Sequence, residues 1–337
     1  MTASQRNISV AVTGAGGFIG RALCERLLAD GFRVKGLVRR SSVVTCGVVR
    51  VEFDSFFNRL ALTRALERAD VVFHLAGRAH VLSDRAANPL NEFRIANVES
   101  TRALLDACAE VGVRRFVLVS SIAAVCSSSP VPVNERTAPN PDTNYGRSKL
   151  EAERLVAAAD DVETVIARPS TVIGPGMKGN PLRLFDFISR GLPVPTTKPI
   201  NQRTILYVEN LVAALILLGT DPRAKGDVFH IGDIPPLSTG EMCRMVASAL
   251  GVPCRELSVP VTILRAGGVL GDLFSRFFPR GFTSATLKSL SDSLIVDSKH
   301  LRERLGYAPP VSLEDGMERT AQWYRKRAVD SRGEMRS

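Results

Sequence analysis

Tyr145 and Lys149 are the two residues whose types and spacing most directly suggest chemistry. They stand four positions apart, so on a helix their side chains share one face and lie one turn from each other. A free phenol titrates near pH ~10 and is a poor base at neutral pH, whereas a nearby ammonium favours the phenolate and lowers the phenol's pKa. The pair could therefore act as an acid and a base in proton transfer. Because this spacing also arises by chance, its meaning depends on what the chain places beside it.

Two other features strengthen this interpretation. Ser120 and Ser121 stand about 25 residues before Tyr145, at the end of a predicted strand. The second feature is a glycine-rich turn at 14–20, which lies between a predicted strand and a predicted helix. A strand, a glycine turn and a helix in this order are the context that a dinucleotide-binding turn requires.

Each glycine of the turn has a separate use in binding a dinucleotide. Gly14 permits the tight turn, Gly17 leaves no side chain between the backbone and a pyrophosphate, and Gly20 lets the helix and strand pack closely. The helix N-terminus then offers free N–H groups and the positive end of its dipole to the phosphates. The spacing is Gly-x-x-Gly-x-x-Gly, whereas many dehydrogenases have Gly-x-Gly-x-x-Gly.

The end of the second predicted strand indicates which cofactor binds. An NAD-selective site usually places an acid there to hold the ribose 2′-OH, but this chain has Val38 followed by Arg39 and Arg40. An arginine can bind a 2′-phosphate through two hydrogen bonds, so we favour NADP(H), with NAD(H) as the alternative. The two arginines could also be solvated loop residues. Asp54, after the third predicted strand, could accept from the adenine amino group or simply form a turn.

Strands and helices alternate through the first half of the chain. This order predicts an α/β fold with a doubly wound parallel (Rossmann) sheet and helices on both faces. Strands are expected at 8–13, 33–38, 48–53, 70–75, 114–120 and 162–167, and helices at 18–30, 60–68, 93–111 and 145–159. Further helices are expected at 182–190, 208–218, 239–250 and 261–277.

Proline and glycine become frequent after the sixth predicted strand, which indicates a second, smaller lobe. We expect residues 1–170 to form the dinucleotide-binding domain, although later segments could return to it. Residues 171–330 should form mainly an α+β substrate lobe at the C-terminal side, and residues 331–337 a frayed tail.

The bulk composition excludes several classes of protein. The 337 residues are 45% apolar and 23% charged, as in soluble globular proteins. The six cysteines and four histidines are scattered, so neither a disulfide framework nor a metal site is expected. The net charge is +10, but no aromatic and basic residues interleave as in a nucleic-acid groove. The longest apolar run, 211–218, is too short to span a membrane, and the polar residues 1–7 show no signal peptide, so we expect a cytoplasmic protein.

Together, the motifs resemble the extended short-chain dehydrogenase/reductase family, in its nucleotide-sugar epimerase/dehydratase branch. The resemblance covers nearly the whole chain. Besides the glycine turn it is carried by His74-Leu75-Ala76-Gly77, by Asn97, by Ser120-Ser121-Ile122, by Tyr145-x-x-x-Lys149 and by the segment from Arg168-Pro169 to Gly174-Pro175.

The resemblance implies a role for each residue of the Ser/Tyr/Lys set. Tyr145 is the proton donor or acceptor, and Lys149 holds the nicotinamide ribose and lowers the phenol's pKa. Ser121 hydrogen-bonds the reacting oxygen, with Ser120 as the alternative because the usual aromatic-Gly ending is replaced by Ala123-Ala124-Val125-Cys126. The cofactor-binding residues that it implies, together with those of the turn and the second and third strands, are Gly14, Gly17, Phe18, Ile19, Gly20, Arg39, Arg40, Asp54, Leu75, Ala76, Gly77, Asn97, Lys149 and Arg168.

Two downstream segments resemble the half of the site that binds the nucleotide-sugar, which is expected to be UDP-linked. Asn180 ends a loop at 176–180 that resembles the family's asparagine loop near the sugar diphosphate, although it could be a plain turn residue. Arg203 opens a segment that resembles Arg-x-x-x-x-Val-x-Asp, in which the arginine binds a diphosphate. Asn210 departs from the usual aspartate there. Arg203 could instead form a surface salt bridge.

Three reactions occur in this branch, and the residues favour one of them. Dehydratases of the branch carry an Asp-Glu pair just after the active-site hydroxyl, where this chain has Ile122-Ala123, so we exclude that reaction. Epimerases recycle NAD in place, whereas Val38-Arg39-Arg40 suits an exchangeable NADPH. We therefore favour a UDP-4-keto-6-deoxy-HexNAc 4-reductase of surface polysaccharide synthesis, ahead of a UDP-sugar 4-epimerase and a non-catalytic NADP-binding regulatory protein.

Two further expectations concern surfaces. The apolar segment 261–277 could be a core helix or lid of the small lobe, or could rest on a membrane surface. Members of the family often pair through two helices from each subunit, so a homodimer formed through 93–111 and 145–159 is expected.

Overall fold

A computed structural model describes residues 8–39, 42–52, 54–79, 88–198, 200–260, 262–263 and 291–333. Arg40, nearly all of the segment 261–277 and the last four residues lie outside this part of the chain. Among the described residues, no helix combines the length and the apolar character that crossing a membrane requires.

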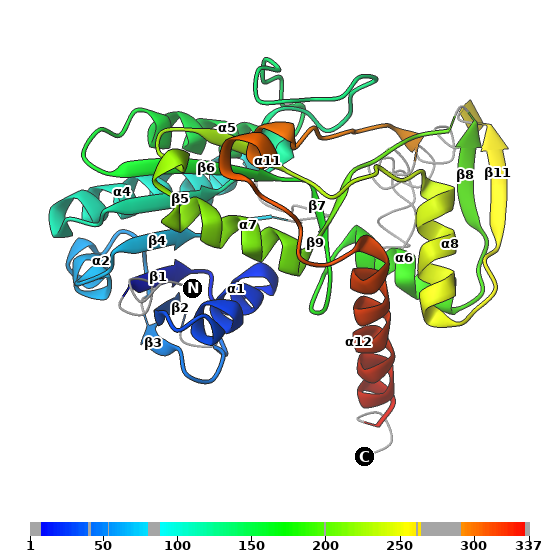
Figure 1. Cartoon of the computed structure of the whole chain (residues 1–337), viewed down its shortest axis with the longest axis horizontal. Helices are drawn as coiled ribbons and strands as arrows, with labels where there is room; N and C mark the ends of the chain where they lie inside the picture. The colour runs from blue at the N-terminus through cyan, green and yellow to red at the C-terminus, as the bar shows by residue number, and fades with distance from the viewer. Residues whose placement is uncertain are drawn as a thin grey trace.

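Seven parallel strands form the main sheet, in the order β10-β6-β5-β4-β1-β2-β3 (Figure 1). They are β1 (Ser9–Thr13), β2 (Arg33–Val38), β3 (Val49–Glu52), β4 (Val71–His74), β5 (Arg115–Val119), β6 (Glu163–Pro169) and β10 (Val228–Ile231). The strand order reverses between β1 and β4, and a ligand crevice forms outside the carboxyl ends of the strands at such a point. The expected doubly wound Rossmann sheet is confirmed.

Helices cover both faces of this sheet because successive side chains of a strand point to opposite sides. Val10 and Val12 of β1 pack in one core with α1 (Phe18–Ala29) and α7 (Val208–Thr220). Ala11 packs in the other core, with α2 (Arg59–Leu66), α4 (Ser100–Val111) and α5 (Asn144–Ala157). Buried strands between two helical layers read as continuous apolar runs, as Val71-Val72-Phe73 does.

The helix expected over 93–111 is interrupted. It begins as α3 (Pro89–Arg94), continues as the π-helical segment η2 (Ile95–Glu99) and only then becomes α4. Single π-helical turns are frequent at functional sites, and this one carries Asn97. A short 3-10 turn, η3 (Ile122–Ala124), follows β5.

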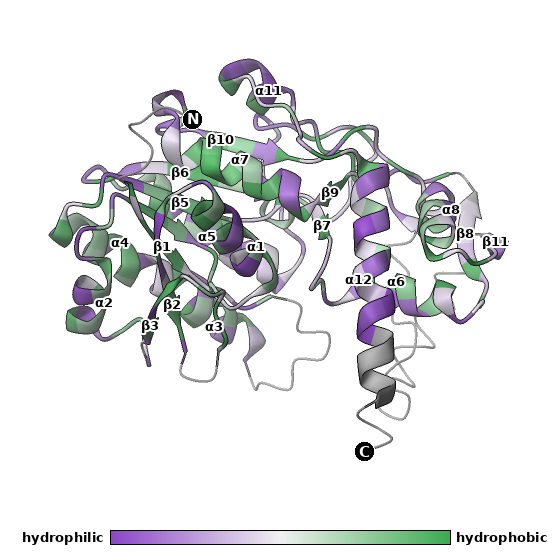
Figure 2. Cartoon of the chain, turned by 60° about the horizontal axis from the view of Figure 1, so that its bottom comes forward, coloured by the Kyte–Doolittle hydropathy of each residue, from purple (hydrophilic) through white to green (hydrophobic). Residues whose placement is uncertain are grey.

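The second lobe lies beside the carboxyl end of the sheet, with α12 (Leu313–Gly333) projecting from it (Figure 1). It also contains α6 (Asn180–Ser189), α8 (Thr239–Leu250) and two small parallel pairs, β7 (Thr171–Ile173) with β9 (Ile205–Tyr207) and β8 (Val194–Lys198) with β11 (Glu256–Pro260). All of these elements except β11 contribute to a separate apolar core. In Figure 2, α7 is mostly hydrophobic, whereas much of α12 is hydrophilic.

Some elements from beyond residue 170 pack with the first domain. β10 pairs with β6, α7 covers one face of the sheet, and α11 (Lys299–Leu305) lies against β10. The sequence pattern predicted no strand after 162–167, because runs of three to five residues such as β9 and β10 are too short to show a periodicity.

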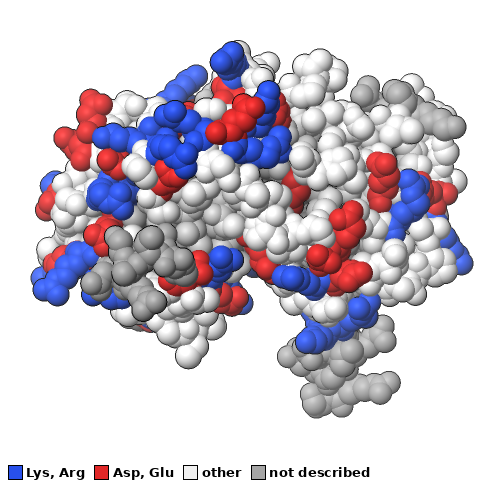
Figure 3. All heavy atoms as spheres, viewed as in Figure 1, with Lys and Arg blue, Asp and Glu red and all other residues white. Residues whose placement is uncertain are grey.

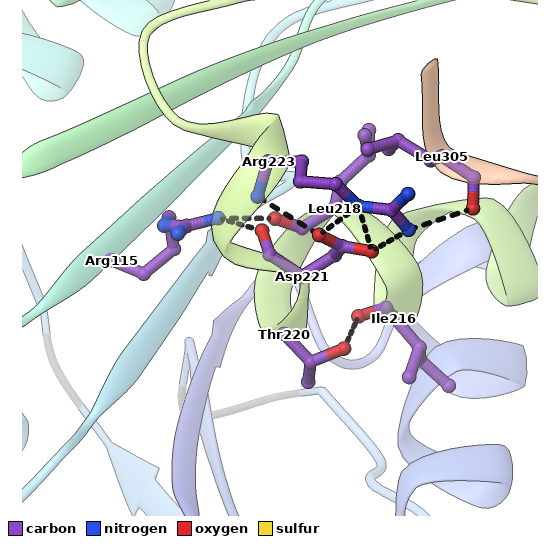
Figure 4. A network of polar contacts seen from close by, with 7 residues as sticks. All are labelled: Arg115, Ile216, Leu218, Thr220, Asp221, Arg223 and Leu305. Carbon is purple, nitrogen blue, oxygen red and sulfur yellow. Dashed lines mark hydrogen bonds and ion pairs between the residues drawn. The ribbon is translucent and has the colours of Figure 1, made fainter. Parts of the chain in front are cut away.

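Arg115 fastens α7 to the amino edge of the sheet. Its buried guanidinium donates to the carbonyls of Leu218, at 2.8 Å, and Asp221, at 3.1 Å, and pairs with Glu163 at 2.8 Å. Figure 4 shows this cation at the C-terminal end of α7, where the helix dipole is negative. The Asp221 carboxylate binds Arg223, which also donates to the Leu305 carbonyl at the end of α11.

Candidate active site

The glycine turn can be built only from glycine at its critical positions. Gly14 has φ +71°, and Gly17 N donates to its carbonyl at 2.9 Å. A Cβ at Gly20 would collide with the Gly14 carbonyl, and a Cβ at Gly14 would lie 3.0 Å from Ala76 N. The turn therefore opens α1 at its N-terminus, where Gly17 offers no side-chain cap and the first turn has no acid. Free N–H groups at such an end suit phosphate oxygens.

A buried histidine joins the glycine turn to the loop after β4. His74 Nδ1 lies 2.7 Å from Thr13 Oγ1, and His74 Nε2 lies 3.0 Å from Thr101 Oγ1. The Thr101 hydroxyl donates its proton to Asn97 O at 2.6 Å, so it must accept from Nε2–H. Thr13 then donates to Nδ1 and accepts from Ala76 N at 3.1 Å. Burial, helped by the charge of Lys149, lowers the His74 pKa to about 3, so the ring is neutral.

Asn97 braces the same loop from the other side. Its Oδ1 accepts from Arg78 N at 2.7 Å, and its Nδ2 donates to Arg78 O at 3.2 Å and to Ser148 Oγ at 2.9 Å. A Cβ at Gly77 would lie 2.6 Å from Asn97 Oδ1, so the loop can approach only at a glycine. The side chain of Asn97, an expected cofactor residue, thus bonds Arg78, directly after the loop Leu75–Gly77, and Ser148 of α5.

Tyr145 and Ser121 meet where α5 begins. Thr143 caps the helix by accepting from Gly146 N at 3.0 Å. A Cβ at Gly146 would collide with the Ala123 carbonyl, so the first turn of α5 rests directly on η3. This contact brings the Tyr145 side chain beside Ser121, close enough for the serine to affect the titration of the phenol.

The pKa of Tyr145 differs from the sequence expectation. Burial raises it, the nearby Ser121 side chain lowers it, and the charge of Glu153 raises it. The net shift is upward because desolvation of the phenolate outweighs the effect that lowers the pKa, so the lowering expected from Lys149 does not set the direction of the shift. The ring packs near Phe93, with 6.2 Å between the ring centroids.

Lys149 lies one turn after Tyr145 and is 6% exposed. Its Nζ donates to the Val119 carbonyl at 2.8 Å. Burial lowers the Lys149 pKa to about 8, and Glu153 opposes this shift. The ammonium is therefore held at the carboxyl end of β5, beside the two serines.

Ser120 and Arg168 are directed away from Tyr145. The Ser120 hydroxyl donates to Glu153, which also binds Arg168 at 2.7 Å. Arg168 NH1 lies 3.3 Å from His230 Nε2, and the Arg168 side chain is buried. We expected Arg168 to contact a cofactor. Its guanidinium instead binds Glu153 and lies against His230. Of the two serines, only Ser121 is placed beside the phenol.

Arg39 and Asp54 are exposed at the carboxyl ends of β2 and β3, on the same edge as the glycine turn. The Arg39 carbonyl accepts from Ser42 N at 2.9 Å, and a Cβ at Gly16 would lie 2.9 Å from Val43 O. The loop after Arg39 thus folds back beside the glycine turn. In doubly wound folds, the adenosine ribose of a dinucleotide lies in this place.

The second lobe contributes Asn180 and Arg203. Asn180 begins α6 after Gly179, whose φ is +72°, and its Oδ1 is buried without a hydrogen-bond partner in the described part of the chain. Arg203 is half-buried and donates from NH1 to the Asp292 carbonyl at 3.0 Å. Burial lowers its pKa, and its charge acts on Cys126, just past η3.

A cavity of about 600 Å³ separates the glycine turn from the second lobe. Its wall includes Gly17 and Arg21 of α1, Lys178 before α6, and Trp323 of α12. Basic and acidic side chains are interspersed on the face seen in Figure 3, so the excess of positive charge forms no single stripe there. All six cysteines are free, and no cluster of His, Cys, Asp and Glu among the described residues could hold a metal ion.

Sequence reasoning missed Glu153 and the chain of Thr13, His74 and Thr101. Glu153 follows Lys149 by four positions on the same face of the helix, as Lys149 follows Tyr145, and that spacing was the available signal. The threonines gave no signal, because only the pairing of β1 with β4 brings Thr13 to His74.

Known proteins resemble both the sequence and the fold. The model of the NAD dependent epimerase/dehydratase family matches residues 10–232. The UDP-glucose 4-epimerase of Vibrio cholerae is 35% identical over 93% of this chain and 94% of its own length. The N-acetyl-alpha-D-glucosaminyl-diphospho-ditrans,octacis-undecaprenol 4-epimerase of Escherichia coli O157:H7 is 26% identical over 94% of this chain and 95% of its own. The structure of MoeE5 in complex with UDP-glucuronic acid and NAD has a TM-score of 0.74 and 27% identity, and covers 95% of this chain and 99% of its own.

Proposed function

Because this chain belongs to the NAD dependent epimerase/dehydratase family, we propose that it transfers a hydride at C4 of a nucleotide-sugar as an NADPH-dependent UDP-4-keto-6-deoxy-HexNAc 4-reductase. The observation that carries the proposal is the meeting of Tyr145 with Ser121, one helical turn from the Lys149 ammonium. All three lie at the sheet edge that also carries the glycine turn.

The protein's own residues would provide the proton and the placement. When bound, a reduced nicotinamide supplies the hydride. Tyr145, kept protonated by its raised pKa, donates its proton to the C4 oxygen as the alcohol forms, and Ser121 hydrogen-bonds the same oxygen. Lys149 holds the nicotinamide ribose and its positive charge stabilises the phenolate that remains.

The residues around the first turn fit a dinucleotide. Gly14, Gly17 and Gly20 leave the backbone open, and the N–H groups of Phe18 and Ile19 lie in the first turn of α1, where phosphate oxygens bind. Arg39 and Arg40 would select the 2′-phosphate of NADP(H), and NAD(H) is the alternative. The solved relative MoeE5 was crystallised with NAD, which favours that alternative.

The second lobe would bind the UDP moiety. Arg203 is proposed to bind the diphosphate, since a guanidinium binds phosphate oxygens through paired hydrogen bonds. Asn180 would direct its amide toward the same ligand, because its buried Oδ1 lacks a partner among the described residues. The structure of MoeE5 is in complex with UDP-glucuronic acid, which supports a UDP-linked substrate for this chain.

The second candidate function is a UDP-sugar 4-epimerase that retains its NAD. The observation that favours it is the 35% identity to a protein named UDP-glucose 4-epimerase. Dehydration is not proposed, because Ile122 and Ala123 in η3 offer no carboxylate after the active-site hydroxyl. A non-catalytic regulatory protein would usually lack Tyr145 or Lys149.

One assay separates the two enzymes. Purified protein is mixed with NADPH and a UDP-4-keto-6-deoxy-HexNAc, and the absorbance of the reduced nicotinamide is followed. A 4-reductase consumes NADPH in proportion to the alcohol formed. Unchanged absorbance, together with interconversion of UDP-GlcNAc and UDP-GalNAc without added cofactor, would assign the protein as the epimerase.

We further propose that the enzyme works in the cytoplasm as a homodimer formed through α4 and α5, without nucleic acid. The outer side of these helices carries the ion pairs Arg59–Glu110 and Arg94–Glu151, so the interface would be polar. Light scattering after size exclusion would give the mass, and a monomer at micromolar concentration would refute the dimer.

A further inference from the structure

A third ionisable residue shares the face of α5 that carries Tyr145 and Lys149. Glu153 lies one turn beyond Lys149 and is only 3% exposed. A carboxylate is rarely buried so completely unless it is paired. The contacts of Glu153 therefore indicate what the buried charge is for.

Both oxygens of Glu153 are bound by neighbouring strands. Arg168 of β6 donates from Nε to Oε1 at 3.1 Å and from NH2 to Oε2 at 2.7 Å. The Ser120 hydroxyl, at the end of β5, donates to Oε1. The carboxylate is thus fixed at the carboxyl ends of the neighbouring strands β5 and β6, in a geometry that allows little movement.

The contact with Ser120 belongs to a register between β5 and α5. Three consecutive residues at the end of β5 each meet one residue of this helix face, in the pairs Val119–Lys149, Ser120–Glu153 and Ser121–Tyr145. The middle pair is the one anchored by a buried ion pair. If the helix moved along its axis or turned, all three contacts would be lost together.

We propose that Glu153 is a positioning residue that locks α5 against the end of β5, and so holds Tyr145 on Ser121 and Lys149 on Val119. This role deepens the hydride-transfer function proposed above and rests on it. Glu153 would contact neither substrate nor cofactor. It would fix the positions of Tyr145 and Lys149 and shift their pKa values.

The surrounding charges give the expected sign of the effect. Glu153 raises the pKa of Lys149 against the burial that lowers it to about 8. Opposite Glu153 stands the Arg168 cation, whereas His230 is neutral because burial and Arg168 lower its pKa to about 4. His74, on β4, is neutral as well, and Glu135 only accepts from His230 N, at 2.7 Å. Without the negative charge of Glu153, the positive charge of Arg168 is no longer neutralised nearby. The pKa of Lys149 should therefore fall further, and the lysine should lose its proton at lower pH.

The test is the pH profile of kcat for NADPH oxidation with UDP-4-keto-6-deoxy-HexNAc. Glu153→Gln keeps the shape of the side chain, and we expect its high-pH limb to fall at a midpoint about one unit lower, with kcat down about tenfold. Glu303→Gln, in an exposed pair with Lys299 on α11, is the matched control and should keep the wild-type profile. Circular dichroism checks that each variant is folded.

Two more variants keep the proposal testable if Glu153→Gln does not fold. Glu153→Asp retains the charge at a shorter reach, so its midpoint should stay while kcat falls. Ser120→Ala retains the ion pair and loses only the contact with β5, and it should also lower kcat without moving the midpoint. A folded Glu153→Gln with an unchanged midpoint, or a wild-type rate for all three variants, would overturn the proposal.

A second readout does not need the reaction. The titration of the Tyr145 phenol is followed by phenolate absorbance, as the difference between each protein and its Tyr145→Phe counterpart. Since Glu153 raises the pKa of Tyr145, Glu153→Gln should lower the midpoint of this titration. If the wild type has no reductase activity but Glu153→Gln still shifts the midpoint, the proposed function is refuted and the role of Glu153 is not. An active enzyme without the shift would refute the role alone.

Discussion

Asn97 donates from Nδ2 to the hydroxyl of Ser148 over 2.9 Å, in the interior between η2 and α5. The same amide accepts from Arg78 N at 2.7 Å, so one side chain ties the loop after β4 to the helix of Tyr145. The loop proposed to bind the cofactor and the helix of the proposed proton donor are therefore joined through one side chain. A substitution at Asn97 should therefore weaken cofactor binding and slow turnover, although its side chain would contact neither the cofactor nor the substrate.

Asn97→Ala removes the acceptor of the part-buried Arg78 N and the buried hydrogen bond to Ser148, and we expect the free energy of unfolding to fall by about 2 kcal/mol. Urea denaturation measures this loss, and quenching of protein fluorescence measures the weaker binding of NADPH. Asn134→Ala, in an exposed turn, should change neither by more than about 0.5 kcal/mol. Equal effects of the two variants would contradict the bracing role.

Tyr145→Phe removes the proposed proton donor and keeps the ring against Phe93. The turnover rate should drop by about 100-fold or more, while the affinity for NADPH stays within about twofold, because the hydroxyl acts only on the reacting oxygen. Steady-state kinetics and a binding titration measure the two quantities. Tyr324→Phe, whose hydroxyl bonds Ser189 and Asp186 in the second lobe, serves as the control. Retained turnover in Tyr145→Phe would exclude the phenol as the acid.

Lys149 should make both activity and stability depend on alkaline pH. Its pKa is lowered from 10.5 to about 8, so activity should decline as pH rises through about 8 and the ammonium is lost. Between these two values the unfolded chain binds more protons than the folded one, so the lysine's contribution to the free energy of unfolding rises with pH. The difference in unfolding free energy, wild type minus Lys149→Met, should rise by on the order of 3 kcal/mol over this range. A constant difference would show that the lysine is not desolvated.

Arg39→Glu tests the choice of cofactor. A carboxylate repels the 2′-phosphate and can accept from the ribose 2′-OH, so KM for NADPH should rise by about tenfold or more and KM for NADH should fall. Initial rates with each cofactor give both constants. Arg33→Glu, at the amino end of the same strand, makes the same charge change away from the site. An unchanged preference in Arg39→Glu would remove Arg39 from the cofactor site.

Asn210 departs from the family's aspartate because a carboxylate already faces it. Its Nδ2 lies 3.0 Å from both oxygens of Asp233, whose pKa burial raises to about 6. Asn210→Asp would set two buried carboxylates together and should cost about 3 kcal/mol of unfolding free energy at pH 8. The cost should shrink below pH about 6, where the pair takes up a proton.

Two further variants separate this repulsion from other effects. The exchange Asn210→Asp with Asp233→Asn restores a single carboxylate and should recover most of the loss. Asn58→Asp caps the N-terminus of α2, where a negative charge is favourable, and should be neutral or slightly stabilising. Thermal denaturation at both pH values measures all four proteins. A pH-independent cost of Asn210→Asp would exclude repulsion as its cause.

The first half of the fold could be predicted because its signals are local. The strand expected at 33–38 agrees with β2. The contacts that require glycine at 17 and 20 lie within the turn itself, whereas Gly14 meets Ala76 and Gly16 meets Val43. Strands of three to five residues beyond 170, such as β7 and β9, were missed because runs so short show no clear periodicity.

The candidate site was less predictable than the fold. The spacing of Tyr145 and Lys149 gave their common face, but it could not give the burial that raises the phenol's pKa. Arg168 was expected at the cofactor because its segment resembles one that lies there, whereas Glu153 holds the side chain behind Ser120. Partners brought together by tertiary packing decide what a motif residue does.

Transfer of deuterium from NADPH labelled at C4 of its nicotinamide ring tests the central claim most directly. The protein is incubated with this cofactor and UDP-4-keto-6-deoxy-HexNAc, and the product is analysed by mass spectrometry and NMR. We predict one deuterium at C4 of the sugar, formed by the wild type and by Tyr324→Phe but at least about 100-fold more slowly by Tyr145→Phe. A product without deuterium at C4, or Tyr145→Phe transferring it at the wild-type rate, would contradict the account.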